Sequence, residues 1–246
     1  PSGTVLWAKL GTGPYQIEAF AVTCDKLNNV YVTGRFRFTA TFGSFSITAK
    51  GTNADIFLVK YDAAGNVLWI KQAGTENGQD IAYGTITDSQ NNVYITGHFE
   101  GSGTFDTVSV NAGVYIAKYD LNGKLIWVRS GGSNISCNFY SIGVDAADNI
   151  YTAGNIADGK IIFGNDTLTA AKSDMMVCKF KSDGNKIWLR KFEGSNEEYA
   201  TTLRVDPAGN AYIGGYSYSK EIDFGPYHFT SYGDADAFVT KVNDAG

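Results

Sequence analysis

Four oxygen-bearing side chains recur at nearly the same place in successive parts of this sequence, and their spacing could build a cation site. Each stands seven or eight residues before an aspartate that opens a predicted turn, and the four are Glu18, Asp80, Asn138 and Glu198. Carboxylates gathered on an axis repel one another unless a cation or water neutralises them, and oxygen ligands suit a hard cation such as Ca²⁺. We therefore expect weak binding of calcium or ordered water by this set and no other cofactor. The alternative is that they are solvated charges at loop ends.

A second set of side chains differs in chemistry from copy to copy, as expected for a binding surface. Each follows the glycine that ends a predicted strand, and the four are Arg35, His98, Asn155 and Tyr216. We expect them to share one face and to contact a ligand. The two histidines, His98 and His228, lie in different copies without a neighbouring nucleophile motif, which is weak support for acid–base chemistry. No nucleophile elbow, phosphate loop or zinc signature occurs, so no catalytic residue is assigned.

The elements that carry these side chains repeat with the tryptophans. Trp7, Trp69, Trp127 and Trp188 are separated by 62, 58 and 61 residues. The last three each end a strand–turn–strand segment with glycine at one fixed turn position, where a positive φ is needed. One tryptophan at one place per repeat predicts packing between neighbouring units rather than a sugar-binding set.

A second hairpin lies between successive tryptophans, in the segments 25–34, 88–97, 145–154 and 206–215. An aspartate opens each turn, where its carboxylate can accept backbone N–H bonds, and a β-branched and aromatic strand follows. A complete calcium loop motif is absent, so these aspartates are predicted to cap turns. The repeated lysines Lys60, Lys118, Lys179 and Lys241 are predicted to be structural or solvated.

Four short strands at a fixed period of about 60 residues are typical of a propeller blade. The sequence therefore predicts an all-β fold, a single four-bladed β-propeller over residues 1–246. The approximate repeats are 11–70, 71–128, 129–189 and 190–246, plus the strand 3–10. Pairing of Gly3–Leu10 with Ala237–Val242 is predicted to close the ring and remove two sheet edges. The alternative is a homodimer in which two chains form one eight-bladed ring.

The composition argues against two classes of binding partner, nucleic acids and the membrane interior. The net charge is −5 and no basic stripe occurs, so nucleic-acid binding is not expected. No apolar run is long enough for a membrane helix, so no membrane insertion is expected. Cys24, Cys137 and Cys178 are odd in number and lack metal-site spacing, which predicts free buried thiols.

The segments KYDAAGNVLW and DSQNNVYITG resemble the bacterial β-propeller repeats of the SBBP type, in four copies over essentially the whole chain. Departures are local: Lys181 replaces a turn aspartate, and Gly113 replaces the aspartate found at Asp55, Asp174 and Asp236. The resemblance implies a secreted or bacterial cell-surface protein whose leader is absent from this chain, with no shared enzymatic activity. The tryptophan-ended hairpin also resembles the repeats of quinoprotein dehydrogenases, although the vicinal cysteine pair found in some of them is missing.

These observations favour a non-catalytic interaction or scaffolding module that binds protein or glycan through a propeller face. A propeller enzyme (a hydrolase, a lyase or a quinoprotein-like enzyme) and a structural spacer within a larger surface protein remain open, because fold does not supply function.

Overall fold

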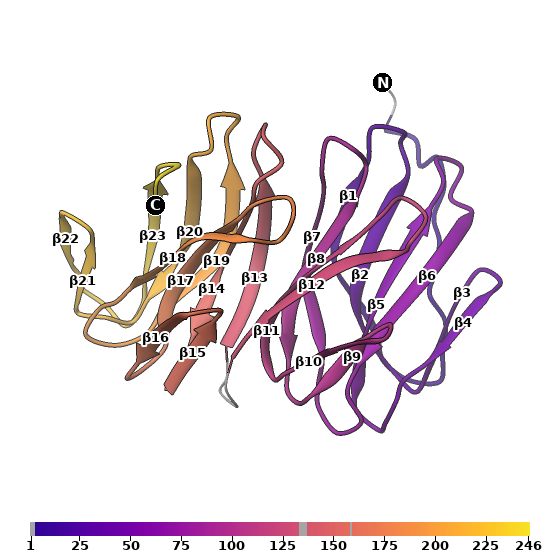
Figure 1. Cartoon of the computed structure of the whole chain (residues 1–246), viewed down its shortest axis with the longest axis horizontal. Coiled ribbons are helices and arrows are strands. Elements are labelled where there is room, and N and C mark those ends of the chain that lie inside the picture. Colours follow the sequence, from indigo (N-terminus) through magenta and orange to yellow (C-terminus); the bar gives the residue numbers. More distant parts are fainter. Residues whose placement is uncertain (1–2, 133–136, 158) are drawn as a thin grey trace.

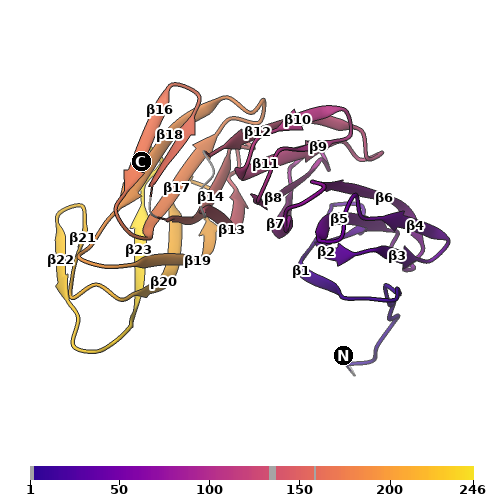
Figure 2. The same ribbon diagram turned by 90° about the horizontal axis from the view of Figure 1, so that it is seen from below.

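The computed structural model describes residues 3–132, 137–157 and 159–246, and these residues form 23 β-strands and no helix. Most strands belong to four radial sheets, which we number 1 to 4 in chain order and which stand side by side along an open arc (Figures 1 and 2). No helix among the described residues is long and apolar enough to cross a membrane. The expected all-β architecture is confirmed.

Each sheet begins with an innermost strand on the concave side of the arc (Figure 2). These strands are β1 (Ile17–Cys24), β7 (Ile81–Thr87), β13 (Cys137–Val144) and β19 (Glu198–Val205). Antiparallel to them run the second strands β2 (Val30–Arg37), β8 (Val93–Phe99), β14 (Ile150–Ile156) and β20 (Ala211–Ser217). The third strands are β5 (Ala54–Tyr61), β11 (Gly113–Tyr119), β17 (Asp174–Phe180) and β23 (Asp236–Val242).

Outer strands complete the first three sheets and are β6 (Val67–Gly74), β12 (Leu125–Gly131) and β18 (Lys186–Phe192). Sheet 4 has three strands and ends at β23. A hairpin is inserted between the second and third strand of every sheet. The hairpins are β3–β4 (Thr39–Phe42, Phe45–Thr48), β9–β10 (Gly103–Phe105, Val108–Val110), β15–β16 (Gly159–Phe163, Asp166–Ala170) and β21–β22 (Glu221–Phe224, Tyr227–Thr230).

The apolar core lies between neighbouring sheets. The third strands β5, β11 and β17 are buried along their whole length, because a sheet covers each of their faces. One cluster fills each junction, and each cluster contains residues of both sheets: Leu58 and Ile95, Ile116 and Ile142, and Val177 and Leu203. Burial of these side chains holds consecutive sheets face to face.

The turn between the first two strands is built as the sequence predicts. Asp88 accepts the backbone N–H groups of Gln90 and Asn92, each at 2.9 Å, and the hydroxyl of Tyr94 at 3.0 Å. The same three bonds recur in the other three sheets, around Asp25, Asp145 and Asp206. The prediction that these aspartates cap turns is confirmed.

The tryptophans join each sheet to the next. Trp127 of sheet 2 donates from Nε1 to the carbonyl oxygen of Ser182 in sheet 3 at 3.1 Å, and its ring lies over Gly184. Gly184 has φ +84°, and a Cβ there would come within 3.0 Å of the ring. Equivalent bonds run from Trp69 to Leu121 and from Trp188 to Asp244. Trp127 is 8% exposed, Trp188 is buried and Trp69 is half-buried, so the predicted packing role is confirmed.

The lysines of the third strands reinforce this contact. Lys118 donates to the Ser182 carbonyl oxygen at 3.2 Å, the same oxygen that Trp127 uses, and Lys60 donates to Leu121 at 2.8 Å. Both lysines are buried. Cys137 and Cys178 are free and buried as expected, but Cys24 is exposed, because it ends β1 at the uncovered end of the arc.

The expected closure of the ring is wrong in this structure. The segment Gly3–Leu10 forms no strand with β23 but lies against sheet 1, where Trp7 Nε1 donates to the carbonyl oxygen of Ala63 at 3.2 Å. Sheets 1 and 4 stand at opposite ends of the arc (Figure 2). The repeated tryptophan and lysine contacts fix how each sheet sits on the next, so the curvature follows from these junctions. The number of blades in a closed ring stays a prediction.

Candidate ligand-binding surface on the concave side of the arc

A β-bulge interrupts every innermost strand at the same place. The unpaired residues are Phe20, Tyr83, Tyr140 and Thr201, each five residues before the aspartate that opens the next turn. A bulge adds one residue to a strand and re-aims its side chain, and bulges are enriched beside functional sites. The concave side of the arc therefore presents one re-aimed side chain per sheet.

The aromatic members of this set contact one another across the sheets. The ring centroids of Phe20 and Tyr83 are 5.5 Å apart, and those of Tyr83 and Tyr140 are 5.1 Å apart. Burial raises the pKa of both tyrosines, so they stay neutral hydroxyl donors near neutral pH. We call Phe20, Tyr83 and Tyr140 the aromatic row.

The four residues predicted to bind a ligand lie directly beside this row. Each occupies the same register position on a second strand: Arg35 pairs with Glu18, His98 with Ile81, Asn155 with Asn138, and Tyr216 with Tyr199. The structure therefore places all four along one rim of the arc, as expected. Their surroundings differ from sheet to sheet.

At sheet 1 the rim is charged. Arg35 Nε is 2.5 Å from Glu18 Oε2, and the Arg35 guanidinium also donates to Gln79 Oε1 at 3.3 Å. The guanidinium carbon lies 5.8 Å from the centroid of the Phe20 ring. The pair is partly exposed, so its charges stay available to a ligand.

At sheet 2 the rim is the half-buried imidazole of His98. His98 lies 5.9 Å from the Tyr83 ring, and burial is the main cause that lowers its pKa, so the ring is neutral at pH 7. His98 Nδ1 is buried and has no hydrogen-bond partner in the part of the chain that the structure describes. Such an unpaired atom is rare in a folded protein and calls for a partner, such as a water or a ligand.

At sheets 3 and 4 the rim changes from amide to aromatic. Asn138 Nδ2 is 3.5 Å from Asn155 Oδ1, and Asn155 is buried and donates to Ser173 Oγ at 2.7 Å. Asn155 is thus less accessible than the sequence suggests. Tyr199 and Tyr216 stack with centroids 5.1 Å apart, and Tyr216 is exposed.

The four residues predicted to hold calcium do not meet at one point. Glu18 and Asn138 occupy one register position, opposite Arg35 and Asn155, whereas Glu198 pairs with Ser217, one position further along, and Asp80 immediately precedes β7. A shift of one residue moves a side chain to the other face of a strand. The expected ring of carboxylates is therefore not assembled.

Asp80 and Glu198 are instead buried and hold nearby loops. Asp80 accepts the backbone N–H of Thr75 at 2.6 Å, and burial raises its pKa to about 7. Glu198 accepts the backbone N–H of Gly194 at 2.9 Å and the Ser217 hydroxyl at 3.1 Å. Within the described ranges no group of three or more histidine, cysteine, aspartate or glutamate side chains could hold a metal. Calcium binding stays a prediction from the sequence.

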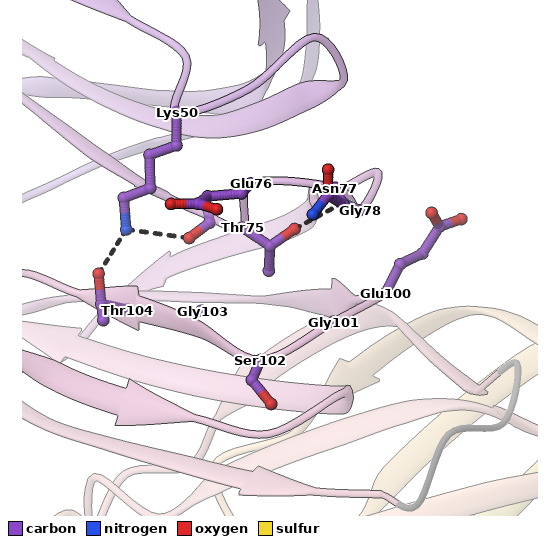
Figure 3. A pocket seen from close by; sticks show the side chains of 11 residues that line it. Lys50, Thr75, Glu76, Asn77, Gly78, Glu100, Gly101, Ser102, Gly103 and Thr104 are labelled. Carbon is purple, nitrogen blue, oxygen red and sulfur yellow. Dashed lines mark hydrogen bonds between the residues drawn. The ribbon is translucent and has the colours of Figure 1, made fainter.

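A separate cavity of about 520 Å³ lies where the hairpin β9–β10 joins β6 (Figure 3). Its lining includes Lys50, Glu76 and Glu100. Lys50 Nζ donates to the Gly74 carbonyl oxygen at 3.0 Å and to the Thr104 hydroxyl, and Glu100 accepts the backbone N–H of Gln79 at 2.7 Å. Lys50 and Glu100 are engaged in holding the loops, so the cavity is a weaker candidate than the concave side.

Sequence reasoning missed the aromatic row, although a signal was present. Phe20, Tyr83 and Tyr140 share a constant distance from the following turn aspartate, whereas the proposed calcium ligands scatter by one residue. The bulge itself cannot be read from the sequence, because it depends on how two strands align.

Comparison with known proteins agrees with the repeat architecture. Over 87% of its length the chain is 26% identical to an uncharacterized WD repeat-containing protein of Acanthamoeba polyphaga mimivirus, and it spans about a fifth (20%) of that protein. A solved structure of a protein of unknown function from Bacteroides caccae matches with a TM-score of 0.32 and 11% identity, covering 75% of this chain and 81% of that one. Residues 68–98, from the end of one tryptophan hairpin into β8, match the beta-propeller repeat family SBBP, which is the repeat type that the sequence pattern resembles.

Proposed function

We propose that this chain is a non-catalytic interaction module that binds a glycan or a protein through the aromatic row and the rim beside it. The observation that carries the proposal is the bulge in each innermost strand, which brings Phe20, Tyr83 and Tyr140 together on the concave side. Binding sites are typically concave and aromatic, with a few polar groups that fix orientation.

Of the two ligand classes, the chemistry favours a glycan. The face of an aromatic ring carries partial negative charge and packs well on the C–H groups of a sugar. The Arg35–Glu18 pair, the Asn138 amide and the tyrosine hydroxyls offer donors and acceptors for sugar hydroxyls around it. Tyrosine and arginine are also enriched at protein interfaces, so a protein ligand is the second candidate.

An enzymatic role has less support. Asp55 and Asp80 are both buried, and burial raises the pKa of both. Both Asp80 oxygens accept backbone N–H groups, from Thr75 at 2.6 Å and Glu100 at 3.2 Å. A carboxylate held in this way positions loops rather than transferring protons. Export to the cell surface remains part of the proposal, on the strength of the sequence resemblance.

The test is binding to an immobilised glycan array, followed by calorimetric titration of the sugars that bind. Replacing Tyr83 or Tyr140 with alanine is expected to weaken binding by on the order of tenfold, or about 1.4 kcal/mol. Tyr227→Ala is the matched control, because Tyr227 is an exposed tyrosine on the distant hairpin strand β22. A glycan that binds the two alanine variants as tightly as the control would refute the site. If no glycan binds, the ligand is expected to be a protein. The same variants then test protein binding in a pull-down.

A further inference from the structure

One face of sheet 4 is exposed to solvent, whereas the same positions are buried in the other sheets. Val239 of β23 is 80% exposed, whereas Leu58, at the same position of β5, is 1% exposed. Tyr212, on the neighbouring strand β20, is exposed, but the equivalent Tyr31, Tyr94 and Tyr151 are fully buried. Among the described residues, no outer strand and no further sheet covers these side chains.

The opposite end shows the complementary exposure. Val22 of β1 is 66% exposed, whereas the equivalent Leu203 of β19 is 0% exposed. In sheets 2 to 4 this face of the innermost strand packs against the preceding sheet. Sheet 1 therefore presents a free face for a preceding sheet, and sheet 4 presents a free face for a following one.

The segment Gly3–Leu10 is not a strand in this arc, but it lies against sheet 1 as an outer strand lies against the sheet that follows it. Trp7 bonds to Ala63 and lies over Gly65 in the way that Trp69 bonds to Leu121 and lies over Gly123. The residues after it extend the match, because Thr12 bridges to Thr41 of the first hairpin, as β6 pairs with β9 of the second. Gly3–Leu10 thus occupies the place of the outer strand of a sheet that would precede sheet 1.

The register of this missing pairing can be read from the complete sheets. Lys60 lies opposite Trp69, Lys118 opposite Trp127, and Lys179 opposite Trp188. The same register sets Lys241 opposite Trp7 and Thr240 opposite Ala8. Lysine and tryptophan both reach one carbonyl oxygen of the following turn, so Lys241 and Trp7 would share the carbonyl oxygen of Ala63.

Within one chain, sheets 1 and 4 stand at opposite ends, with β23 far from Gly3–Leu10 (Figure 2). We propose that two copies of this chain join head to tail, with Gly3–Leu10 of each copy completing sheet 4 of the other, to form one closed ring of eight sheets. The contact is made twice about a two-fold axis, and it pairs the edge of β23 that is open in the single arc.

The first test is the mass of the 246-residue protein in solution, by light scattering over a range of concentrations. The expected mass is twice the chain mass of 26.5 kDa. Val239→Lys should give the single-chain mass with an unchanged circular dichroism spectrum, because Val239 is exposed in the isolated arc. Leu27→Lys, at an exposed apolar residue in the first turn, is the matched control and should keep the double mass.

A cross-link tests the register and identifies the donor chain. In a Cys24→Ser background, Ala8→Cys combined with Thr240→Cys is expected to form a disulfide that joins two chains on a non-reducing gel. Ala8→Cys combined with Lys241→Cys is out of register and should cross-link poorly. A disulfide within one chain, a single-chain mass at every concentration, or an open-ended series of larger masses would each overturn the proposal.

Discussion

The outer junctions and the inner rim of this protein follow opposite rules. At the outer side, every tryptophan makes the same bond to the following turn, with N···O distances from 3.0 to 3.2 Å. At the rim, the same register position holds arginine, histidine, asparagine and tyrosine in turn. The repeated contact determines the fold, and the varied position is where a ligand can be recognised. Stability and binding should therefore respond to different residues.

The largest effect on stability is expected at the junction between sheets 2 and 3. Trp127→Ala removes a buried ring and its bond to Ser182, and should lower the free energy of unfolding by about 3–5 kcal/mol. Chemical denaturation measures the change. Tyr216→Ala, at an exposed rim residue, should cost less than about 1 kcal/mol. Equal costs for the two variants would break the distinction between junction and rim.

A smaller loss is expected when the turn glycine beneath that ring is changed. Gly184→Ala combines a positive φ with a Cβ 3.0 Å from Trp127, and should cost about 1–3 kcal/mol. Gly164→Ala is the control, because its φ is +64° and nothing lies within 4 Å of its Cβ. The difference between the two melting temperatures reports the contacts of the new Cβ with the Trp127 ring and with Arg129 Nε. Equal melting temperatures would mean that the Trp127 ring moves aside without a measurable loss of stability.

The pH dependence of stability should report Asp80. Burial raises its pKa from 3.8 to about 7, so between these values the folded protein holds a proton that the unfolded chain has lost. Stability from protonated Asp80 is fully present below pH 4 and is lost as the pH rises through 7, by at most about 1.4 kcal/mol per pH unit. Asp80→Asn should flatten this slope in thermal melts from pH 4 to 8.

Other groups also contribute to the pH dependence, so the comparison with Asp80→Asn is essential. Burial raises the pKa of Asp55 and Glu198, which adds a slope of the same sign. Burial lowers the pKa of His98, which removes stability as the pH falls. Asp55, Glu198 and His98 are present in both the wild type and Asp80→Asn, so the difference between the two slopes reports Asp80. An identical slope in wild type and variant would show that Asp80 is ionised in the fold.

The smallest effect on stability is expected at the aromatic row. Tyr140→Phe keeps the ring and its contact with Tyr83, and should change the free energy of unfolding by less than about 0.5 kcal/mol. Loss of the hydroxyl should still weaken the binding of a sugar that uses it. Calorimetry of unfolding and of binding on the same sample separates the two. A large loss of stability would place Tyr140 with the junction residues.

The sequence alone determined the repeating parts, because these depend on residues within about ten positions of one another. The aspartate caps, the turn glycines and the alternating strands act locally, and each is found where the pattern predicts it. The side chains of the rim were also predictable, since one fixed position after a strand recurs in every repeat. The family resemblance rests on the same local pattern.

Only the tertiary structure decided the bulges and the course of the arc. One extra residue in each innermost strand re-aims Phe20, Tyr83 and Tyr140, and this depends on how two strands align. Ring closure depends on how each sheet sits on the next, which is set by packing between residues about 60 positions apart. A repeat pattern gives the unit but not the rotation between units, because the rotation is a property of their contact.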